Sequence, residues 1–265
     1  MRRWTVVVPF KGAADAKSRL SGSLDDPERA AIALAFLVDT VSAVRRVPAV
    51  SCVVVVSNQP GLAADLAVGQ ATDRTDVRTL VVADPGGGIN VAVASGLAHA
   101  REAAPEAFTA AITGDLAALR PADLAQAFAL AEAAATSTGA QVLNTRTGSN
   151  TGRSSEPVHA QLSFVPDREG SGTTMVAFAP GAHAPTHFGI GSAAAHTSAG
   201  YLALAVPAGS SLRLDIDDAD DLERARLLGL GDATRAVLEQ RVRPRSSDPA
   251  TRPADAPGAG RGRAR

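Results

Sequence analysis

Three consecutive glycines, Gly86, Gly87 and Gly88, stand between an apolar run at residues 80–83 and a helix-like stretch at residues 91–100. Glycine lets the backbone approach a ligand closely, and the first turn of a helix offers N–H groups that lack helical partners. A nucleotide would suit such a position. A tight strand-to-helix turn also needs glycine for conformational reasons alone, so the cluster by itself fits a structural role equally well.

Three cations, Lys11, Lys17 and Arg19, follow the first apolar run at residues 5–8. In open α/β sheets, ligands bind beyond the carboxyl ends of the strands, where these side chains could clamp a triphosphate. Cations also decorate many exposed loops, and the chain contains no G-x-x-x-x-G-K-[ST] string. The cations alone therefore leave both interpretations open.

Carboxylates occur at two places where they could bind Mg²⁺. Asp115 follows an apolar run at residues 110–113, and the next helix is expected to begin only near Pro121, which favours a metal ligand over a helix cap. Asp215 and Asp217 are two residues apart, so on an extended segment they face the same side. Together with Asp115 they could complete an Mg²⁺ site with substrate phosphates, while neighbouring acids cap the helix that follows.

Two further segments, residues 168–174 and 188–192, combine glycines with hydroxyl side chains. Their backbone N–H groups and hydroxyls suit a small phosphorylated or carboxylated ligand. Ser192 is also expected to cap a helix at residues 193–199, a role that requires no ligand.

The histidines lack the spacing of a zinc site. His183, His187 and His196 are expected on the surface, with His187 and His196 as potential ligand contacts. The chain also lacks the G-x-S-x-G string of a serine nucleophile.

Apolar runs alternate with Ala- and Leu-rich helical stretches, which predicts an α/β fold with a mainly parallel sheet flanked by helices. Strands are expected at residues 5–8, 53–57, 79–82, 110–113, 140–143, 174–177 and 202–206. The first helix should begin at Asp25 or Asp26 and end before Pro48. Further helices are expected from Pro121 to about residue 135 and at residues 222–228.

The composition is that of a globular protein, with 45% hydrophobic residues in a chain of 265. The single cysteine, Cys52, lies in an apolar run, which excludes an internal disulfide and predicts a buried, inert thiol. No segment has the length of a membrane span or the pattern of a signal peptide, so we expect a cytoplasmic protein without a membrane partner.

The net charge of −1 hides an asymmetry between the two ends of the chain. Residues 241–265 contain seven arginines and two aspartates, together with four prolines and three glycines, and we expect a disordered basic tail. The tail lacks interleaved aromatic residues, so no nucleic-acid partner is expected. Residues 1–240 are expected to form one domain, with a surface loop at about residues 144–160.

Six blocks, taken in order, resemble the guanylyltransferases of deazaflavin coenzyme F420 biosynthesis, which act on 2-phospho-L-lactate or phosphoenolpyruvate. The blocks are residues 8–11 with 16–20, 86–90, 114–116, 170–174, 188–193 and 212–217. Six blocks in order are far more specific than any single one, and the match runs from residue 4 to about residue 230. Ala117 and Ile190 stand where proline is expected and Ser171 where threonine is usual, but no charged or phosphate-binding group is lost.

The resemblance implies a nucleotide-diphospho-sugar transferase (Rossmann-like) fold. It also implies transfer of GMP from GTP to the phosphate of a three-carbon acid, with release of pyrophosphate. The residues implied are Lys11, Lys17 and Arg19 for the triphosphate; Gly86, Gly87, Gly88 and Asn90 for guanine or ribose; Thr173 or Thr174, Gly189 and Ser192 for the acid; and Asp115 with Asp217 or Asp215 for Mg²⁺.

The chemistry agrees with these residues, because nucleotidyl transfer requires positioning and charge neutralisation, and an ionised phosphate needs no general base. Phosphoenolpyruvate is the preferred acceptor, since the Ala-, Arg- and Gly-rich composition suggests an actinobacterial source. The same reaction on 2-phospho-L-lactate, or a nucleotidyltransferase of the sugar-nucleotide or molybdopterin guanine dinucleotide type, remains an alternative. A non-catalytic nucleotide-binding regulator is disfavoured by Asp115 and the Asp215–Asp217 pair. A homodimer and hand-over of the product to the next transferase of the pathway stay open.

Overall fold

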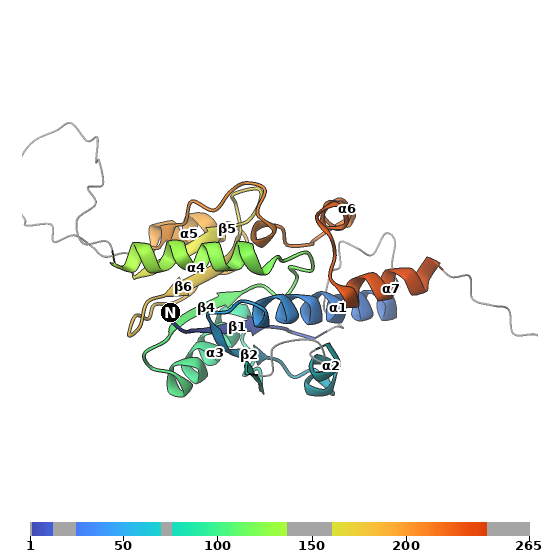
Figure 1. Ribbon diagram of the computed structural model, residues 1–265, viewed down its shortest axis with the longest axis horizontal. Coiled ribbons are helices and arrows are strands. Elements are labelled where there is room, and N and C mark those ends of the chain that lie inside the picture. The colour runs from blue at the N-terminus through green and yellow to red at the C-terminus, as the bar shows by residue number, and fades with distance from the viewer. Residues whose placement is uncertain (1, 13–24, 70–75, 137–160, 243–265) are drawn as a thin grey trace, which may run out of the picture.

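The centre of the molecule is a seven-stranded sheet with the order β3-β2-β1-β4-β6-β5-β7. A computed structural model describes residues 2–12, 25–69, 76–136 and 161–242 of the chain (Figure 1). The strands are β1 (Trp4–Pro9), β2 (Val50–Val56), β3 (Arg78–Val82), β4 (Phe108–Ile112), β5 (Leu162–Pro166), β6 (Thr173–Phe178) and β7 (Leu202–Ala203). The helices are α1 (Asp26–Arg45), α2 (Leu62–Gly69), α3 (Ile89–Ala103), α4 (Pro121–Thr136), α5 (Ser192–Ser198), α6 (Ala219–Leu228) and α7 (Asp232–Val242), with a 3₁₀ helix, η2 (Ser211–Arg213).

The sheet is mainly parallel, as predicted. β1 pairs in parallel with β2 and β4, and β2 pairs in parallel with β3. β6 is antiparallel to both of its neighbours, β4 and β5. The carboxyl ends of β1 to β5 and the amino end of β6 therefore share one edge of the sheet, which we call the ligand edge.

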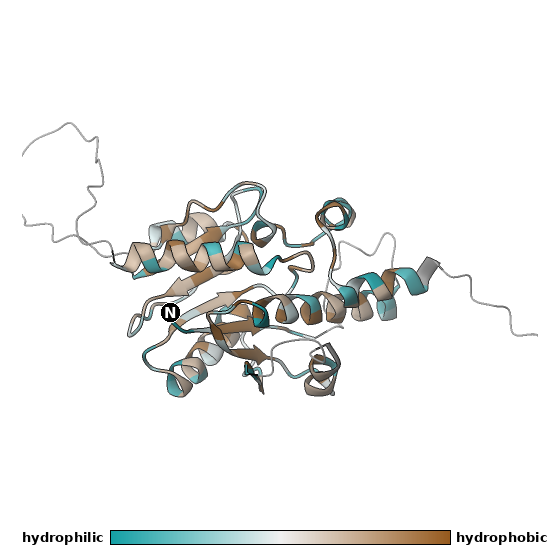
Figure 2. Ribbon diagram, in the orientation of Figure 1, coloured by the Kyte–Doolittle hydropathy of each residue, from teal (hydrophilic) through white to brown (hydrophobic). Residues whose placement is uncertain are grey.

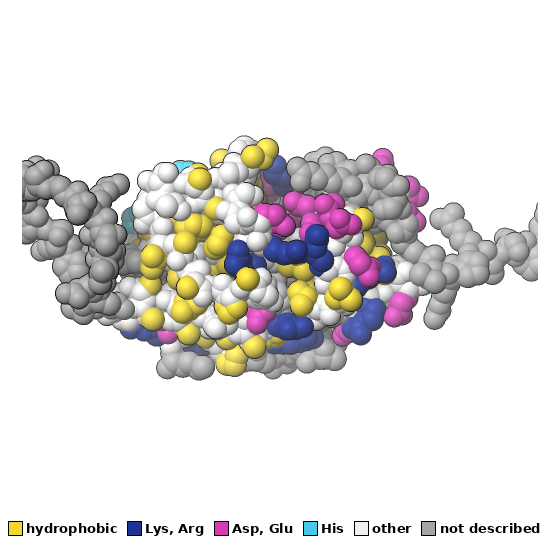
Figure 3. All heavy atoms as spheres, turned by 90° about the horizontal axis from the view of Figure 1, so that it is seen from above, with side chains coloured by type: hydrophobic (Ala, Val, Ile, Leu, Met, Phe, Trp, Pro, Cys, Tyr) yellow, Lys and Arg dark blue, Asp and Glu magenta, His cyan; other side chains and the backbone are white. Residues whose placement is uncertain are grey.

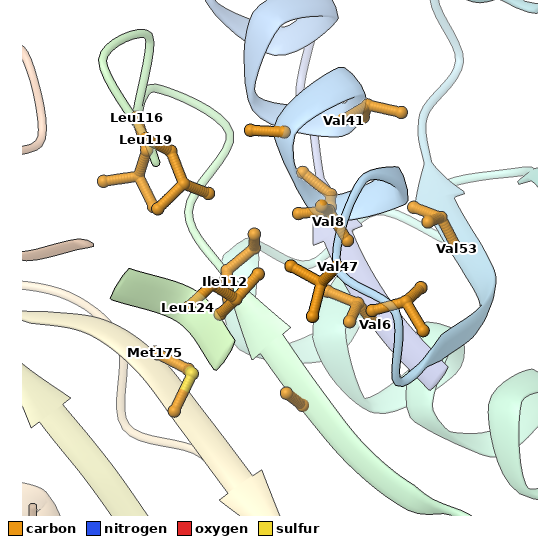
Figure 4. Close-up of a cluster of buried hydrophobic side chains, with 14 of the residues drawn as sticks. Val6, Val8, Val41, Val47, Val53, Ile112, Leu116, Leu119, Leu124 and Met175 are labelled. Atoms are coloured by element: carbon orange, nitrogen blue, oxygen red, sulfur yellow. The ribbon is translucent and has the colours of Figure 1, made fainter. Parts of the chain in front are cut away.

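Helices cover both faces of the sheet, and α3 and α4 lie on opposite sides of it (Figure 1). On one face, α1 and α4 share one apolar cluster with β1 and β4, and Figure 4 shows Leu124 of α4 beside Ile112 of β4 in the same cluster as Val41, Val6 and Val8. On the other face, α3 and α5 pack against a second apolar cluster. The strongly hydrophobic colour of the central strands in Figure 2 agrees with this burial on both faces.

The predicted start of α1 is confirmed and has a capping box. The N–H of Glu28 donates to Oδ1 of Asp25 at 2.9 Å, and the N–H of Asp25 donates to Oε2 of Glu28 at 3.1 Å. Pro27 occupies the first turn, where its missing N–H costs nothing. α1 is therefore fixed at the end that lies next to the ligand edge.

Six of the seven predicted strands are present, although β7 ends at Ala203 instead of residue 206. The prediction missed β5, α2 and α7. The predicted strand at residues 140–143, the surface loop at about residues 144–160 and all of the predicted tail except residues 241 and 242, which end α7, lie outside the described residues. Among the described helices, none combines the length and the apolar character that crossing a membrane requires.

Candidate functional site

The structure brings the predicted site segments together at the ligand edge. Lys11 follows β1, Gly88 follows β3, and Asp115 follows β4. The segment leading into β6 joins them, because the N–H of Thr113 donates to the carbonyl oxygen of Thr174 at 3.0 Å. Blocks that are far apart in the sequence therefore meet at one edge, as the rule for open α/β sheets predicts.

Lys11 is exposed at this edge, directly after a backbone bond from Phe10 N to Val56 O of 2.9 Å. Gly12 follows with φ = 101°, and a Cβ there would lie 3.2 Å from Oε1 of Gln59. The loops after β1 and β2 are thus in contact. Lys17 and Arg19 lie outside the described residues, so their role stays a prediction.

The glycine cluster forms the entry to α3. Gly86, Gly87 and Gly88 have φ angles of 80°, 82° and 99°, which other residues rarely adopt. The N–H of Gly86 donates to Oδ1 of Asp84 at 2.8 Å, and Gly88 caps α3 without a side-chain bond. The conformational role of the glycines is therefore real, and they place the start of α3 at the ligand edge. Nucleotide binding here remains a prediction.

A fourth glycine, Gly96, sets how closely α3 approaches the sheet. A Cβ at this position would lie 2.4 Å from Cγ1 of Val7 and 2.7 Å from Cγ2 of Val56. Both distances are shorter than real Cβ contacts, so only glycine fits without movement of β1, β2 or α3. This close packing fixes the distance between α3 and the sheet, and with it the position of the start of α3 at the ligand edge.

Asp115 is anchored by its neighbours on both sides. Gly114 packs beside β1, where a Cβ would lie 3.4 Å from the carbonyl oxygen of Pro9. The buried Leu116 donates its N–H to Oγ1 of Thr40 at 3.1 Å. α4 begins at Pro121, as predicted, so Asp115 lies six residues before the helix and does not cap it.

Asp215 and Asp217 lie next to Asp115 in space, because the N–H of Ile216 donates to the carbonyl oxygen of Asp115 at 3.2 Å. Leu214 and Ile216 are buried, whereas the two aspartates are only partly buried. This alternation agrees with the predicted extended segment, in which both carboxylates face the same side. The acids that follow serve α6: Asp218 is its N-cap and accepts from the N–H of Asp221 at 2.9 Å.

The donor set suits a hard cation shared with a ligand. The described part of the chain has no cluster of three or more His, Cys, Asp or Glu side chains arranged to hold a metal. Mg²⁺ usually takes only one or two carboxylates from the protein and fills its octahedral shell with water and substrate phosphates. Carboxylates on two adjoining segments, Asp115 on one and Asp215 and Asp217 on the other, therefore fit Mg²⁺ bound together with a nucleotide.

Two polar contacts hold the segment that carries Asp215 and Asp217. Oδ2 of Asp123, in the first turn of α4, accepts from the N–H and the hydroxyl of Ser211 at 2.7 and 2.6 Å. Arg213 donates from Nε and Nη2 to the carbonyl oxygen of Asp167 at 3.1 and 2.7 Å. The carboxylate segment is thus tied both to α4 and to the end of β5.

The turn between β5 and β6 is built around the buried carboxylate of Asp167, which was not among the predicted site residues. Oδ1 of Asp167 accepts from the N–H of Ser171 at 2.9 Å, and Oδ2 accepts from the N–H of Gly172 at 2.7 Å. A Cβ on Gly172 would lie 2.3 Å from Oδ2 of Asp167. An aspartate shortly before a Gly-Ser-Gly string is the sequence signal of such a turn.

The two threonines that follow have different surroundings. The Thr174 side chain is fully buried, with its hydroxyl 3.5 Å from the carbonyl oxygen of Val165. The Thr173 hydroxyl lies 3.1 Å from Nδ1 of His196. Contact of either threonine with a substrate remains a prediction.

His196 is not a surface residue as predicted, because its side chain is completely buried. Its ring packs among Phe164, Phe188 and Tyr201, with ring centroids 5.6, 5.7 and 5.0 Å away. Burial, reinforced by the nearby His187, lowers the pKa of His196 from 6.5 to about 4. The imidazole is therefore neutral at pH 7. The sequence around His196 is Ala-rich and helical, so it did not indicate that aromatic side chains from other segments surround the ring.

The segment at residues 188–192 turns sharply before α5. Gly189 has φ = 131° and Gly191 has φ = 72°. Gly191 is the N-cap of α5, and Ser192 is the buried first residue of the helix, so the predicted cap at Ser192 is wrong by one position. Between the two glycines, the Ile190 side chain is fully exposed.

Asn90 connects this segment to the glycine cluster. Oδ1 of Asn90 accepts from the N–H of Phe188 at 2.8 Å and from the hydroxyl of Thr186 at 3.0 Å. Nδ2 of Asn90 donates to the carbonyl oxygen of Phe188 at 3.0 Å. The Asn90 amide therefore joins two of the predicted binding segments, and its contact with a nucleotide remains a prediction.

The surface has two further features. A cavity of about 770 Å³ between α1 and α7 is lined by residues that include Leu34, Val38, Arg46 and Arg235, but by none of the predicted site residues. On the face seen in Figure 3, acidic side chains gather beside a group of Lys and Arg side chains. The cavity therefore does not belong to the predicted site.

Comparison with known proteins identifies the relatives of this chain. The family described as "Guanylyl transferase CofC like" matches residues 4–144. A phosphoenolpyruvate guanylyltransferase of Streptomyces coelicolor is 40% identical over 236 residues, covering 89% of this chain and 95% of the relative. A phosphoenolpyruvate guanylyltransferase of Salinispora arenicola is 42% identical over 232 residues, covering 87% of this chain and 91% of the relative.

The fold has a solved counterpart. A crystal structure provisionally assigned to a nucleotide-diphospho-sugar transferase of Desulfovibrio desulfuricans G20 superposes with a TM-score of 0.58 at 14% identity. The match covers 91% of this chain and 96% of that chain. The predicted nucleotide-diphospho-sugar transferase fold is thereby confirmed.

Proposed function

Because the chain belongs to the CofC-like guanylyl transferase family, we propose that it transfers GMP from GTP to the phosphate of phosphoenolpyruvate in coenzyme F420 biosynthesis. The products are enolpyruvyl-diphospho-guanosine and pyrophosphate. One structural observation supports this proposal more than any other. The glycine cluster, the aspartate segments and both glycine–hydroxyl turns meet at the ligand edge, where two substrates could lie side by side.

In this reaction an oxygen of the acceptor phosphate attacks the α-phosphorus of GTP. A new P–O bond forms, the bond from the α-phosphorus to the bridging oxygen breaks, and pyrophosphate leaves with that oxygen. The attacking phosphate is already ionised at neutral pH, so the protein needs no general base. Its main tasks are to align the two phosphates and to offset their negative charge.

The described residues can share these tasks. Lys11, exposed beyond β1, would contact the triphosphate together with Lys17 and Arg19. The backbone of Gly86–Gly88 would approach guanine or ribose. The turn at Thr173 and Thr174 and the turn at Gly189 and Ser192 would hold the phosphate and carboxylate of the acid.

Asp115 with Asp217 or Asp215 would hold Mg²⁺, which supplies charge stabilisation for the phosphates when it is bound. The half-buried positions of these carboxylates, on segments joined by the Ile216–Asp115 backbone bond, support this assignment. The proposal includes a location in the cytoplasm and hand-over of the product to the next transferase of the pathway. A homodimer is left open.

The decisive experiment measures pyrophosphate release by the purified protein with GTP, Mg²⁺ and either phosphoenolpyruvate or 2-phospho-L-lactate. We expect release that depends on the acid, with a higher kcat/KM for phosphoenolpyruvate, and little release when ATP or CTP replaces GTP. A higher kcat/KM for 2-phospho-L-lactate would replace the acceptor but keep the reaction. No release with either acid, by protein that binds GTP, would refute the proposal.

A further inference from the structure

His196 forms hydrogen bonds to both of the turns that are proposed to hold the acceptor acid. On one side, ring Nδ1 lies 3.1 Å from Oγ1 of Thr173, the first residue of β6 after the β5–β6 turn. On the other side, ring Nε2 accepts from the backbone N–H of His187 at 3.0 Å. The next residue along, Phe188, begins the second turn and is held by Asn90. One buried ring therefore spans the gap between the two turns.

These contacts determine where the ring proton lies. A backbone N–H can only donate, so Nε2 must be the nitrogen without a proton. The proton of the neutral ring then lies on Nδ1, 3.1 Å from the Thr173 hydroxyl oxygen, and the backbone of Ser192, one helical turn earlier, also interacts with the ring. Among the residues that the structure describes, no carbonyl or carboxylate oxygen accepts the Thr173 hydroxyl proton in return. The hydroxyl is thus left as a donor at the amino end of β6, where Thr173 is 5% exposed.

The surroundings of the ring prevent it from turning away. Phe164, Phe188 and Tyr201 contact it, and the Tyr201 hydroxyl donates to the carbonyl oxygen of Pro185 at 3.0 Å. These neighbours are aromatic and include no carboxylate; the backbone of Ser192 favours a charged imidazole, but the effect of burial is larger. The ring therefore acts as a fixed, neutral spacer.

We propose that His196 is a positioning residue that sets the separation of the two acceptor-binding turns and directs the Thr173 hydroxyl proton toward the acceptor acid. The inference rests on the proposed function, because it assigns the two turns to the acid and not to GTP. It assigns to His196 no contact with the reacting atoms. Loss of the two hydrogen bonds of the His196 ring should weaken acid binding and leave GTP binding unchanged.

The test compares three variants by the KM for each substrate. His196→Phe keeps an aromatic ring but removes both nitrogens, and we expect it to raise the KM for phosphoenolpyruvate about tenfold, as for one lost hydrogen bond between protein and a charged ligand. The KM for GTP should change by less than about twofold, because the change lies outside the GTP segments. His196→Asn places an amide donor near the position of Nδ1 and should recover part of the loss. In a Thr173→Val background, His196→Phe should have much less further effect, since the donor it directs is already absent.

Phe128→Leu is the matched control for lost stability. Phe128 is equally buried but stacks on Trp4, with ring centroids 3.9 Å apart, in the cluster on the other face of the sheet. This variant should lower the melting temperature without changing the ratio of the two KM values. The same acid-specific loss in Phe128→Leu, or equal increases in both KM values in His196→Phe, would overturn the inference.

Amide hydrogen exchange gives a second readout that does not need turnover. In His196→Phe, the amides of residues 171–173 and 187–189 should exchange faster than in the wild type, whereas in Phe128→Leu they should not. Unchanged protection in both turns would overturn the inference even if the enzyme is active. Absence of acid-dependent turnover in the wild type would instead refute the proposed function, and the exchange result would still decide whether His196 fixes the turns.

Discussion

The two halves of the sheet are held together by different interactions. In the parallel half, β1 to β4 with α1 and α3, apolar contacts dominate and Val6, Val7 and Val8 are completely buried, although the buried side chains of Asp39 and Arg45 also form hydrogen bonds. In the half formed by β5 to β7 and α5, the buried Asp167 and His196 bond to the backbone of the turns around them. Apolar packing fixes the shape of the first half, whereas specific hydrogen bonds fix the turns of the second.

This difference matters because the two halves carry different parts of the proposed site. The glycine cluster that precedes α3 belongs to the apolar half, and the two glycine–hydroxyl turns belong to the hydrogen-bonded half. Changes in packing should therefore affect stability and nucleotide binding, while loss of a single buried polar group should affect the acid. Asp115 lies at the boundary between the two halves, since its carbonyl oxygen accepts from the N–H of Ile216.

The largest effect is expected at this boundary. Asp115→Asn removes the charge proposed to hold Mg²⁺, and we expect kcat to fall about a thousandfold, because metal stabilisation of a phosphoryl transition state amounts to several kcal/mol. The melting temperature should change little. Glu106→Gln is the control, because it also replaces a carboxylate by an amide, but at an exposed position before β4. This variant should keep full activity. Activity within tenfold of the wild type would remove Asp115 from the metal site.

The second expected effect concerns stability as a function of pH. The pKa of His196 is about 4 in the folded protein, whereas a histidine of the unfolded chain has the ordinary value of 6.5. The neutral form of His196 therefore stabilises the fold above pH 6.5. This contribution is lost as the pH falls from 6.5 to about 4, and it corresponds to about 3 kcal/mol.

Urea unfolding of wild type and His196→Phe at pH 7 and pH 4.5 measures this contribution. The wild type should lose more free energy of unfolding than the variant, which has no titrating group at position 196. His187 and Tyr201 also face the ring, and both remain in the variant. Equal losses in the two proteins would show that the hydrogen-bonded half does not depend on a neutral His196.

The smallest effect is expected in the apolar half. Gly96→Ala places a Cβ against Val7 and Val56, and overpacking of this kind costs about 1–3 kcal/mol in the free energy of unfolding. Any change in KM should concern GTP, because α3 begins at the glycine cluster. Gly209→Ala is the matched control, since a Cβ at Gly209 would meet nothing within 4 Å. A rise in the KM for the acid alone would contradict the division between the two halves.

The sequence predicted the apolar half better than the hydrogen-bonded half, and the same physical difference explains why. Runs of Val such as residues 53–56 indicate buried strands directly, and Asp25 and Pro27 mark the start of α1. In β5, Ser163 is as deeply buried as Phe164, so the strand lacks both a continuous apolar run and a regular alternation. The sequence of β5 therefore has neither of the patterns that indicate a strand.

The candidate site shows the same limit. The blocks could be recognised from residue types and order, and their meeting at one edge follows from a parallel sheet. The partners of Asn90 and His196 could not be predicted, because Asn90 bonds to a residue 98 positions away and His196 depends on aromatic neighbours from several segments. Such contacts arise only from the tertiary structure.

One further contact bears on how the chain reaches this state. Asp39, in the middle of α1, accepts from the N–H groups of Ala233 and Thr234, which are 194 and 195 residues later in the sequence. The first helix therefore provides the cap for the last described one, and contacts at such long sequence separation form slowly. We expect α7, and the carboxylate segment that leads into α6 before it, to dock late. During translation, the parallel strands can assemble first, but a complete binding edge has to wait until the carboxylate segment at residues 215–217 has left the ribosome, and the cap of α7 until residues 233 and 234 have followed.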